Sequence, residues 1–381
     1  MIGKTLKFTS AGLAAALLWP AAVSAEIGSW QQDRAAAVAA YGAGNYGDAE
    51  ARLLDAIGRA KNFGPRDPRL AATLNDLALT YFRLGRYAEA EPLHIRALEI
   101  RERVYGKEDP KVAATLNDLA FLYVAQGRTA EAGPLHERAL AIREKAFGPD
   151  HPEVAESLNN IGGLYLELDR YAEAEEFYQR ALGIVGTSLG ETHPFTIASL
   201  NNLAAVYDEQ GRYAEAAPLY MKALGAAEKT LGEHPQVAAS LNNLAQHYDA
   251  QGKLDLAEPL YKRALDITRK TLGAEHPDVA ASLDHLGMLY AAQGKYELAE
   301  SQYLQALEIR RVRLGSVHVL VAQSLEHYSL LLTELGRMNE AQRAQTLAAS
   351  IRVRAAEVNR ISIEDAGPAP KPAIKKIVTS G

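Results

Sequence analysis

The chain of 381 residues is long enough for two or three ordinary domains or for one extended repeat array. Hydrophobic residues make up 48% and charged residues 23%, a composition that excludes a largely disordered chain. The formal charge of −6 argues against a nucleic-acid partner, because phosphate contacts need a basic surface. The absence of cysteine excludes disulfides, thiolate zinc sites and cysteine nucleophiles.

The first 25 residues have the pattern of an export signal. Lys4 and Lys7 precede an apolar stretch over residues 8–23, and small residues lead to Ala25. This order is typical of a secretory signal peptide at residues 1–25, cleaved after Ala25. The alternative is an uncleaved anchor, but the stretch is shorter than the ~20 residues that span a bilayer. We therefore expect an exported chain, periplasmic or secreted, with no stable membrane insertion after cleavage.

A repeat of 42 residues occupies most of the chain. A proline marks each unit, followed six residues later by a leucine that opens a block such as LNDLA or LNNLA. Successive marks are 42 residues apart, except for one step of 41 in a loop where a lost residue costs little. The marks are Pro68, Pro110, Pro152, Pro194, Pro235 and Pro277, with Val319 in the seventh place.

Each unit is predicted to form two helices. Pro68 suits the first helical position, where its missing N–H loses no partner, and Asp67 before it can cap the helix. Gly85 ends the first helix as a residue that tolerates a left-handed conformation. Apolar residues at helical spacing follow on both helices: Leu74, Leu77, Ala78 and Tyr81, then Ala90, His94, Ala97 and Leu98. Neither helix buries its stripe alone, so the hairpins must stack into an all-α solenoid.

These units resemble the tetratricopeptide repeat. The residues that carry the resemblance are Leu77, Ala78, Tyr81, Gly85, Tyr87 and Ala90 in the first full unit. The 42-residue period and the L-G-x-x-H-P linker are similar to the kinesin light chain subclass. The resemblance implies a right-handed superhelical solenoid that binds proteins or peptides. We expect a degenerate capping repeat at 26–64, seven repeats at 65–355, and an extension at 356–381 that is disordered from about 361.

The resemblance also implies a concave groove lined by the first helices, where the family binds extended peptides. The residue after the motif asparagine, together with two apolar neighbours, supplies the candidate site. An amide at this position offers a donor and an acceptor to a peptide backbone. The alternative is a row of merely solvated polar residues. The candidates are Asp76, Leu79, Asp118, Phe121, Asn160, Asn202, Asn243, His285 and His327.

The same row changes in chemistry along the chain. Asp76 and Asp118 favour a cationic ligand end beside apolar pockets in the N-terminal half. His285 and His327 are expected to attract anions below about pH 6.5. A further basic row lies on the second helices. Its members either meet an acidic partner, or pair with Glu89, Glu131, Glu173 or Glu215 of their own helix, or are simply solvated. That row is Arg96, Arg138, Arg180, Lys222 and Arg263.

Catalytic and metal-binding motifs are missing from the sequence. Five histidines recur once per unit, but neighbouring units lie about 10 Å apart, too far for a shared zinc. They are interpreted as helix-start residues: His151, His193, His234, His276 and His318. We therefore expect no cofactor, no metal and no enzyme activity, and a scaffold that binds a peptide or protein segment. The alternative function is a structural protein that self-associates through its end faces.

The export hypothesis gives the first prediction. Signal cleavage after Ala25 makes Glu26 the mature N-terminus. Mass spectrometry of the protein from fractionated cells checks this, and an intact Met1 would contradict both cleavage and export.

Overall fold

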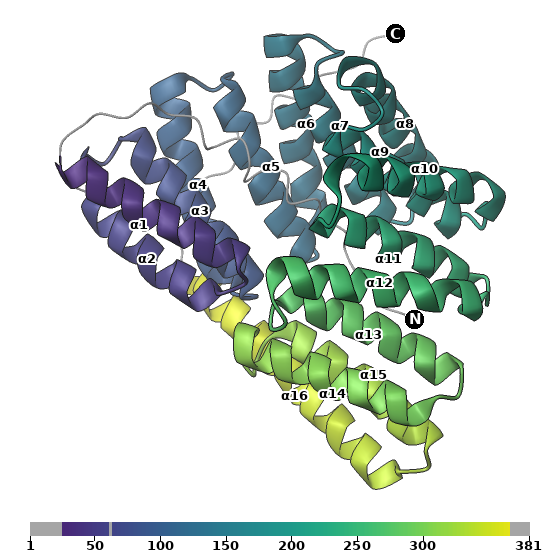
Figure 1. Ribbon diagram of the computed structural model, residues 1–381. Coiled ribbons are helices and arrows are strands. Elements are labelled where there is room, and N and C mark those ends of the chain that lie inside the picture. The colour runs from purple at the N-terminus through teal and green to yellow at the C-terminus, as the bar shows by residue number, and fades with distance from the viewer. Residues whose placement is uncertain (1–24, 61–62, 366–381) are drawn as a thin grey trace.

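The computed structural model describes residues 25–60 and 63–365. Within them the chain forms sixteen α-helices and no strand, which confirms the all-α solenoid (Figure 1). The expected signal peptide, apart from Ala25, and residues 366–381 lie outside the described part. The last helix continues to Asp365, so the expected disorder from about residue 361 is wrong for 361–365.

The helices pair into eight successive antiparallel hairpins in the described chain. The segment expected to cap the array forms the first hairpin, α1 (Ala25–Gly42) and α2 (Tyr46–Ala60). The others are α3 (Pro68–Arg83) with α4 (Tyr87–Tyr105), α5 (Pro110–Ala125) with α6 (Thr129–Phe147), α7 (Pro152–Glu167) with α8 (Tyr171–Ser188), α9 (Pro194–Glu209) with α10 (Tyr213–Leu231), α11 (Pro235–Ala250) with α12 (Leu254–Leu272), α13 (Pro277–Ala292) with α14 (Tyr296–Leu314), and α15 (Val319–Glu334) with α16 (Met338–Asp365).

The start of each odd-numbered helix from α3 onward carries a side-chain cap. The Asp67 carboxylate accepts a hydrogen bond from the Arg69 N–H at 2.8 Å, and Asp109 accepts one from Lys111 at 2.8 Å. In the later units a histidine Nδ1 accepts from the N–H two residues on, at 3.1 to 3.2 Å. A cap of this kind satisfies one of the free N–H groups of the first turn. The interpretation of the five histidines as helix-start residues is confirmed.

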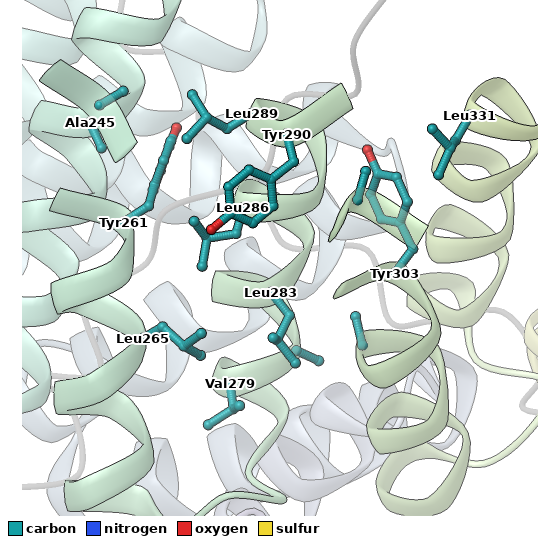
Figure 2. Packing of buried hydrophobic residues seen from close by; sticks show 14 residues of the cluster. Ala245, Tyr261, Leu265, Val279, Leu283, Leu286, Leu289, Tyr290, Tyr303 and Leu331 are labelled. Carbon is teal, nitrogen blue, oxygen red and sulfur yellow. The ribbon is translucent and has the colours of Figure 1, made fainter. Parts of the chain in front are cut away.

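The core is a continuous stack of apolar stripes from neighbouring hairpins. Figure 2 shows one section, in which Tyr261 and Leu265 of α12 face Leu283 and Leu286 of α13, with Tyr303 of α14 on the other side. All five side chains are buried. Each stripe is therefore shielded from water only by the next unit, as repeat architectures require.

A row of buried or half-buried asparagine amides also links consecutive units. The motif asparagine of one unit donates its side-chain N–H to the serine hydroxyl of the next: Asn159 to Ser199 at 3.0 Å and Asn201 to Ser240 at 3.1 Å. Asn75 instead donates to Asp118 at 2.9 Å. Because a buried polar group without a partner is costly, these bonds fix the register of one hairpin on the next.

The array curves until its two ends meet. Figure 1 shows α14 and α16 lying beside the N-terminal hairpins, and the structure places α16 against α4 and α14 against α2. None of the described helices is long and apolar enough to cross a membrane.

The stacked core gives the second prediction. Leu203 of α9 is 5% exposed between neighbouring hairpins, so Leu203→Ala should lower the free energy of unfolding by ~2 to 5 kcal/mol. Leu304→Ala removes a side chain that is 45% exposed and should cost less than ~1 kcal/mol. Urea denaturation followed by circular dichroism measures both. Equal losses from the two variants would contradict this description of the core.

Candidate functional site

The predicted groove positions lie on the first helix of each unit, on the face away from the buried stripe. Their side chains are half-buried and not freely exposed, except that Asn243 is buried at 9% exposure. The structure therefore assembles the predicted row, but the chemistry of its members differs from one end to the other.

The two acids at the N-terminal end are already paired. The Asp76 carboxylate accepts a hydrogen bond from Arg34 of α1 at 2.5 Å, and Asp118 accepts one from Asn75 at 2.9 Å. Burial raises the pKa of both carboxyls, although Arg34 acts in the opposite direction at Asp76 and Asn75 does so at Asp118. The expected attraction for a cationic ligand end is corrected, because internal partners already compensate these carboxyls.

The apolar positions beside them are also filled from within the protein. Leu79 borders a cleft of only about 10 Å³, together with Tyr41 and Leu53. The ring of Phe121 lies 5.1 Å from that of Phe82, centroid to centroid. The expected apolar pockets in the N-terminal half are therefore packed by neighbouring side chains of the same protein.

The amides in the central units have a different environment. Within the described part of the chain, the side chains of Asn160, Asn202 and Asn243 have no hydrogen-bond partner. The adjacent Asn159 and Asn201 point the other way and donate to serines of the next unit. Neighbouring asparagines thus differ: one binds the next unit, and the other makes no hydrogen bond within the described chain.

The C-terminal end of the row carries two imidazoles with internal neighbours. Nε2 of His285 lies 3.1 Å from the Gln246 amide nitrogen. His327 lies 4.0 Å from the carboxylate of Asp284 and is largely covered. Burial lowers the pKa of His327 below its usual 6.5, although Asp284 acts in the opposite direction. The expected anion attraction below about pH 6.5 is corrected for His327, which needs a more acidic solution to become charged.

The predicted basic row forms ion pairs with other units. Arg138 pairs with Glu102 at 2.6 Å and Arg180 with Glu144 at 2.6 Å, each across one unit boundary. The same geometry joins Arg263 to Glu228, and Lys222 meets Glu191 in the preceding loop at 2.7 Å. Arg96 alone of this row pairs within its own helix, with Glu99 at 2.8 Å. From Arg138 onward the row is thus a ladder of ion pairs between units.

The glutamates expected to pair with that row have another partner. Glu89, Glu131, Glu173 and Glu215 each pair with the arginine that follows the hairpin turn, at 2.6 to 2.8 Å. Arg128 is representative, because it also reaches Glu91 of the previous unit at 2.7 Å and lies 3.9 Å from the Tyr123 ring centroid. A basic residue directly after the turn in nearly every unit was the sequence signal for this cluster.

Two buried arginines near the ends of the array were not foreseen. Arg143 is 2% exposed and donates to the Ser157 hydroxyl at 2.9 Å. Arg310 is 5% exposed and binds both Asp284 and Ser324. The central units carry Val185, Ala227 and Thr268 at the same position. These charges bind one hairpin to the next.

Two more buried histidines make the fold sensitive to acid. His94 and His136 lie 3.0 and 2.9 Å from the motif asparagine of their unit, and burial lowers their pKa to about 3 and about 4. The unfolded chain therefore takes up more protons below pH 6.5. Stability is complete above about pH 6.5 and is lost as the pH falls toward 4.

This linkage is the third prediction. The double variant His94→Tyr, His136→Tyr introduces the residue that later units carry there, such as Tyr178 and Tyr220. It should flatten the dependence of unfolding free energy on pH between about 6.5 and 4. His193→Asn, which keeps a helix cap, should retain the wild-type slope. Urea titrations at several pH values measure the slopes, and an unchanged slope in the double variant would contradict the assignment.

Comparison with known proteins identifies the repeat. The sequence model of the tetratricopeptide repeat matches residues 33–103, 69–132, 111–185, 169–229, 195–270, 236–311 and 286–352. These overlapping matches cover most of the chain and begin within the first hairpin. No curated protein shows a significant match to the chain.

Solved structures with similar repeats include kinesin light chain-like proteins. The TPR-like repeats of one from Podosopora anserina are 30% identical over 53% of this chain and 96% of theirs, with a TM-score of 0.45. BtubC from P. vanneervenii is 25% identical, covers 61% of this chain and 92% of its own, and has a TM-score of 0.48. A Rap protein complexed with Competence and Sporulation Factor is 15% identical, with coverage of 89% and 90% and a TM-score of 0.62, which is a likeness of fold alone.

Proposed function

The chain belongs to the tetratricopeptide repeat family, whose members are generally protein-interaction scaffolds, and we propose that it binds an extended peptide or protein segment in its concave groove. The observation that supports this is the run of amides at Asn160, Asn202 and Asn243, in three consecutive units, that have no hydrogen-bond partner within the described chain; Asn160 and Asn202 are half-buried and Asn243 is 9% exposed. Elsewhere along the row, Asp76, Asp118 and His285 have hydrogen-bond partners within the protein, and His327 lies 4.0 Å from the Asp284 carboxylate.

The spacing of these amides suits an extended chain. Successive units place equivalent side chains roughly 10 Å apart, since packed helices lie 8 to 10 Å from each other. An extended peptide advances about 3.3 Å per residue, so each amide meets about every third residue. An asparagine side chain both donates and accepts, and it therefore binds backbone N–H and C=O groups whatever the peptide sequence. The proposed ligand is recognised by its extended conformation at the centre of the array.

The rival function, assembly through the end faces, has less support. A further unit would pack on α16 where inner units carry a buried Tyr220 or Tyr261 and a leucine such as Leu224. The last unit has Gln345 and Ala349 there, both exposed. Gln345 and Ala349 suit a terminal cap that stays in water, although Val353, one turn further along the same face, is also exposed.

The proposal includes no catalytic step. The family and its structural relatives are generally non-enzymatic scaffolds. The described residues contain no group of three or more side chains arranged to hold a metal ion. From the export signal expected at residues 1–25 we also propose that this scaffold acts in the periplasm or outside the cell.

The fourth prediction tests the amides directly. Peptides selected from a displayed library on the wild-type protein serve as probes for isothermal titration. Each Asn→Ala change at 160, 202 and 243 should cost a net ~0.5 to 1.5 kcal/mol, so the triple variant should bind at least about tenfold more weakly.

The controls separate binding from folding. Gln345→Ala removes an exposed amide on α16, and Glu173→Ala removes an exposed carboxylate on α8, so neither should change the affinity. Circular dichroism of the triple variant should match that of the wild type. Full affinity in a normally folded triple variant would exclude the groove as the binding site.

A further inference from the structure

Two separate stretches of the chain meet where the curved array closes on itself. The N-terminal side consists of the first two hairpin turns, with Gly44, Asn45, Arg83, Gly85 and Ala88. The C-terminal side consists of two loops between units and the end of α16, with His276, Arg313, His318 and Asn359. We call this contact the seam. It joins residues more than 230 positions apart in sequence, so it closes the solenoid into a ring (Figure 1).

The same contact is made twice, one unit apart. A Cβ added to Gly44 would lie 2.5 Å from Pro277 and 2.9 Å from the His276 ring. A Cβ added to Gly85 would lie 3.1 Å from the His318 ring. At the equivalent glycines within the described chain a Cβ would meet nothing within 4 Å: Gly127, Gly211, Gly252, Gly294 and Gly336. Two successive turns thus lie against two successive histidines in register.

Residues at the seam are more buried than the residues at the same repeat positions in other units. Ala88 is 3% exposed, whereas the residues at its position in the later units are all exposed: Ala130, Ala172, Ala214, Asp255, Glu297 and Asn339. His276 and His318 are 6% and 7% exposed, while the same helix-start position is half-buried or exposed in the other units. Since the repeat geometry is otherwise constant, this difference in burial is due to the contact between the two ends.

Specific hydrogen bonds hold the seam. The Asn359 side chain accepts from the Ala88 N–H at 3.1 Å and donates to the Gly85 carbonyl at 3.1 Å. It thereby satisfies a free N–H in the first turn of α4, a helix with no side-chain cap of its own. Nε2 of His318 lies 3.2 Å from the Arg83 carbonyl, and Arg313 donates to Asn45.

The sequence is adapted to this contact at Asn45. The residue after the turn is basic in every later unit: Arg86, Arg128, Arg170, Arg212, Lys253, Lys295 and Arg337. Asn45 is the exception, and it is the one that faces a cation, Arg313. A lysine or arginine there would place like charges together, so the amide is what the closed ring requires.

The buried histidines give the seam a proton-dependent chemistry. In His318, Nδ1 accepts from the Leu320 N–H at 3.1 Å, so the ring proton lies on Nε2 and is donated to the Arg83 carbonyl. Nδ1 of His276 likewise accepts from the Asp278 N–H at 3.1 Å. A second proton at Nδ1 would face an N–H donor and break the cap. The exposed His234 is free to turn toward water, but the seam histidines are enclosed.

The charges around these rings are mostly positive. His276 lies 3.7 Å from the Asp278 carboxylate, but Arg83 and Arg313 are also close, and Glu275 binds Arg313 at 2.6 Å. Arg310 is the charged group near His318. The described neighbours Tyr41 and Tyr46 carry neutral hydroxyls near Arg83. Burial lowers the pKa of His318 to about 4 and also lowers that of His276, although Asp278 acts in the opposite direction there.

We propose that the seam is a proton-operated latch: the ring is closed at neutral pH and opens when His276 and His318 each take up a proton. The sign follows from linkage, because the open form has ordinary imidazoles and binds protons more readily than the closed form. Closure is therefore complete above about pH 6.5 and is lost as the pH falls toward 4. This inference does not rest on the proposed peptide binding.

The fifth prediction measures the latch as a distance. The chain has no cysteine, so Ala51→Cys on α2 and Val312→Cys on α14 provide two unique spin-label sites on helices that meet at the seam. Both positions are exposed. Electron–electron double resonance should give one narrow distance at about pH 7.5 and a longer, broader distribution at about pH 5. Labels at Met221 and Leu256, which do not span the seam, should show no change.

Two pairs of variants test the mechanism. Ala88→Glu puts a carboxylate into the seam at a helix N-terminus, where an acid does not harm the helix, and it should open the ring at neutral pH. Ala214→Glu makes the same change at an exposed equivalent and should leave the distance unchanged. The double variant His276→Asn, His318→Asn keeps both helix caps and should move the opening midpoint down by at least about one pH unit. The double variant His151→Asn, His193→Asn should not move it.

Each outcome tests a separate part of the proposed latch. A long, broad distance in the wild type at about pH 7.5, or no response to Ala88→Glu, would show that the seam does not exist in solution. Opening at the same pH in the His276→Asn, His318→Asn variant would show that these histidines are not the sensor. Circular dichroism at each pH identifies unfolding, so that loss of helix is not mistaken for opening of the ring.

Discussion

Every other feature of this chain depends on one constraint, which is that a two-helix unit buries its apolar stripe only against the next unit. Leu283 and Leu286 of α13 are buried in a cluster built from their own unit and its two neighbours, α11 to α15. The packing surface is therefore the same at every boundary, and the angle between units repeats. Small residues at fixed positions, such as Ala204 and Ala245, keep the helices close. The packing between neighbouring repeats therefore determines the curvature of the whole array.

A constant angle has a consequence beyond local packing, because after enough units the array meets its own beginning. A contact between distant parts of a chain normally requires a long loop to be ordered, with an entropic cost. Here the intervening units are already stacked, so bringing the two ends together costs little further conformational entropy. This explains how a seam built from a few hydrogen bonds and two glycines can form. It also explains why a modest change in charge at the seam is enough to shift the balance.

The sequence predicted the parts that depend on local spacing. The period, the apolar stripes, the aspartate and histidine caps and the family were all visible, because helical periodicity and capping involve residues a few positions apart. The partners of Arg138 and Arg180 were predicted wrongly, since their carboxylates lie in the preceding unit, 36 residues away. The pairing of Asp76 was missed for the same reason, as Arg34 belongs to a hairpin whose sequence is degenerate. The one sequence signal of the seam was Asn45 among basic residues.

The proposed groove and the seam lie in parts of the chain that differ in one respect, namely whether their polar side chains have hydrogen-bond partners within the protein. At the N-terminal end of the row, internal contacts occupy the carboxyls of Asp76 and Asp118, and at the C-terminal end burial disfavours the charged form of His327, so these residues offer little to a ligand. In the centre the motif asparagines bind the stack, and the next residue in each unit is left unbonded within the described chain. The three amides lie on α7, α9 and α11, which the seam does not touch. Ligand binding and ring closure therefore act on different helices, and any coupling between them must pass through the angle between units.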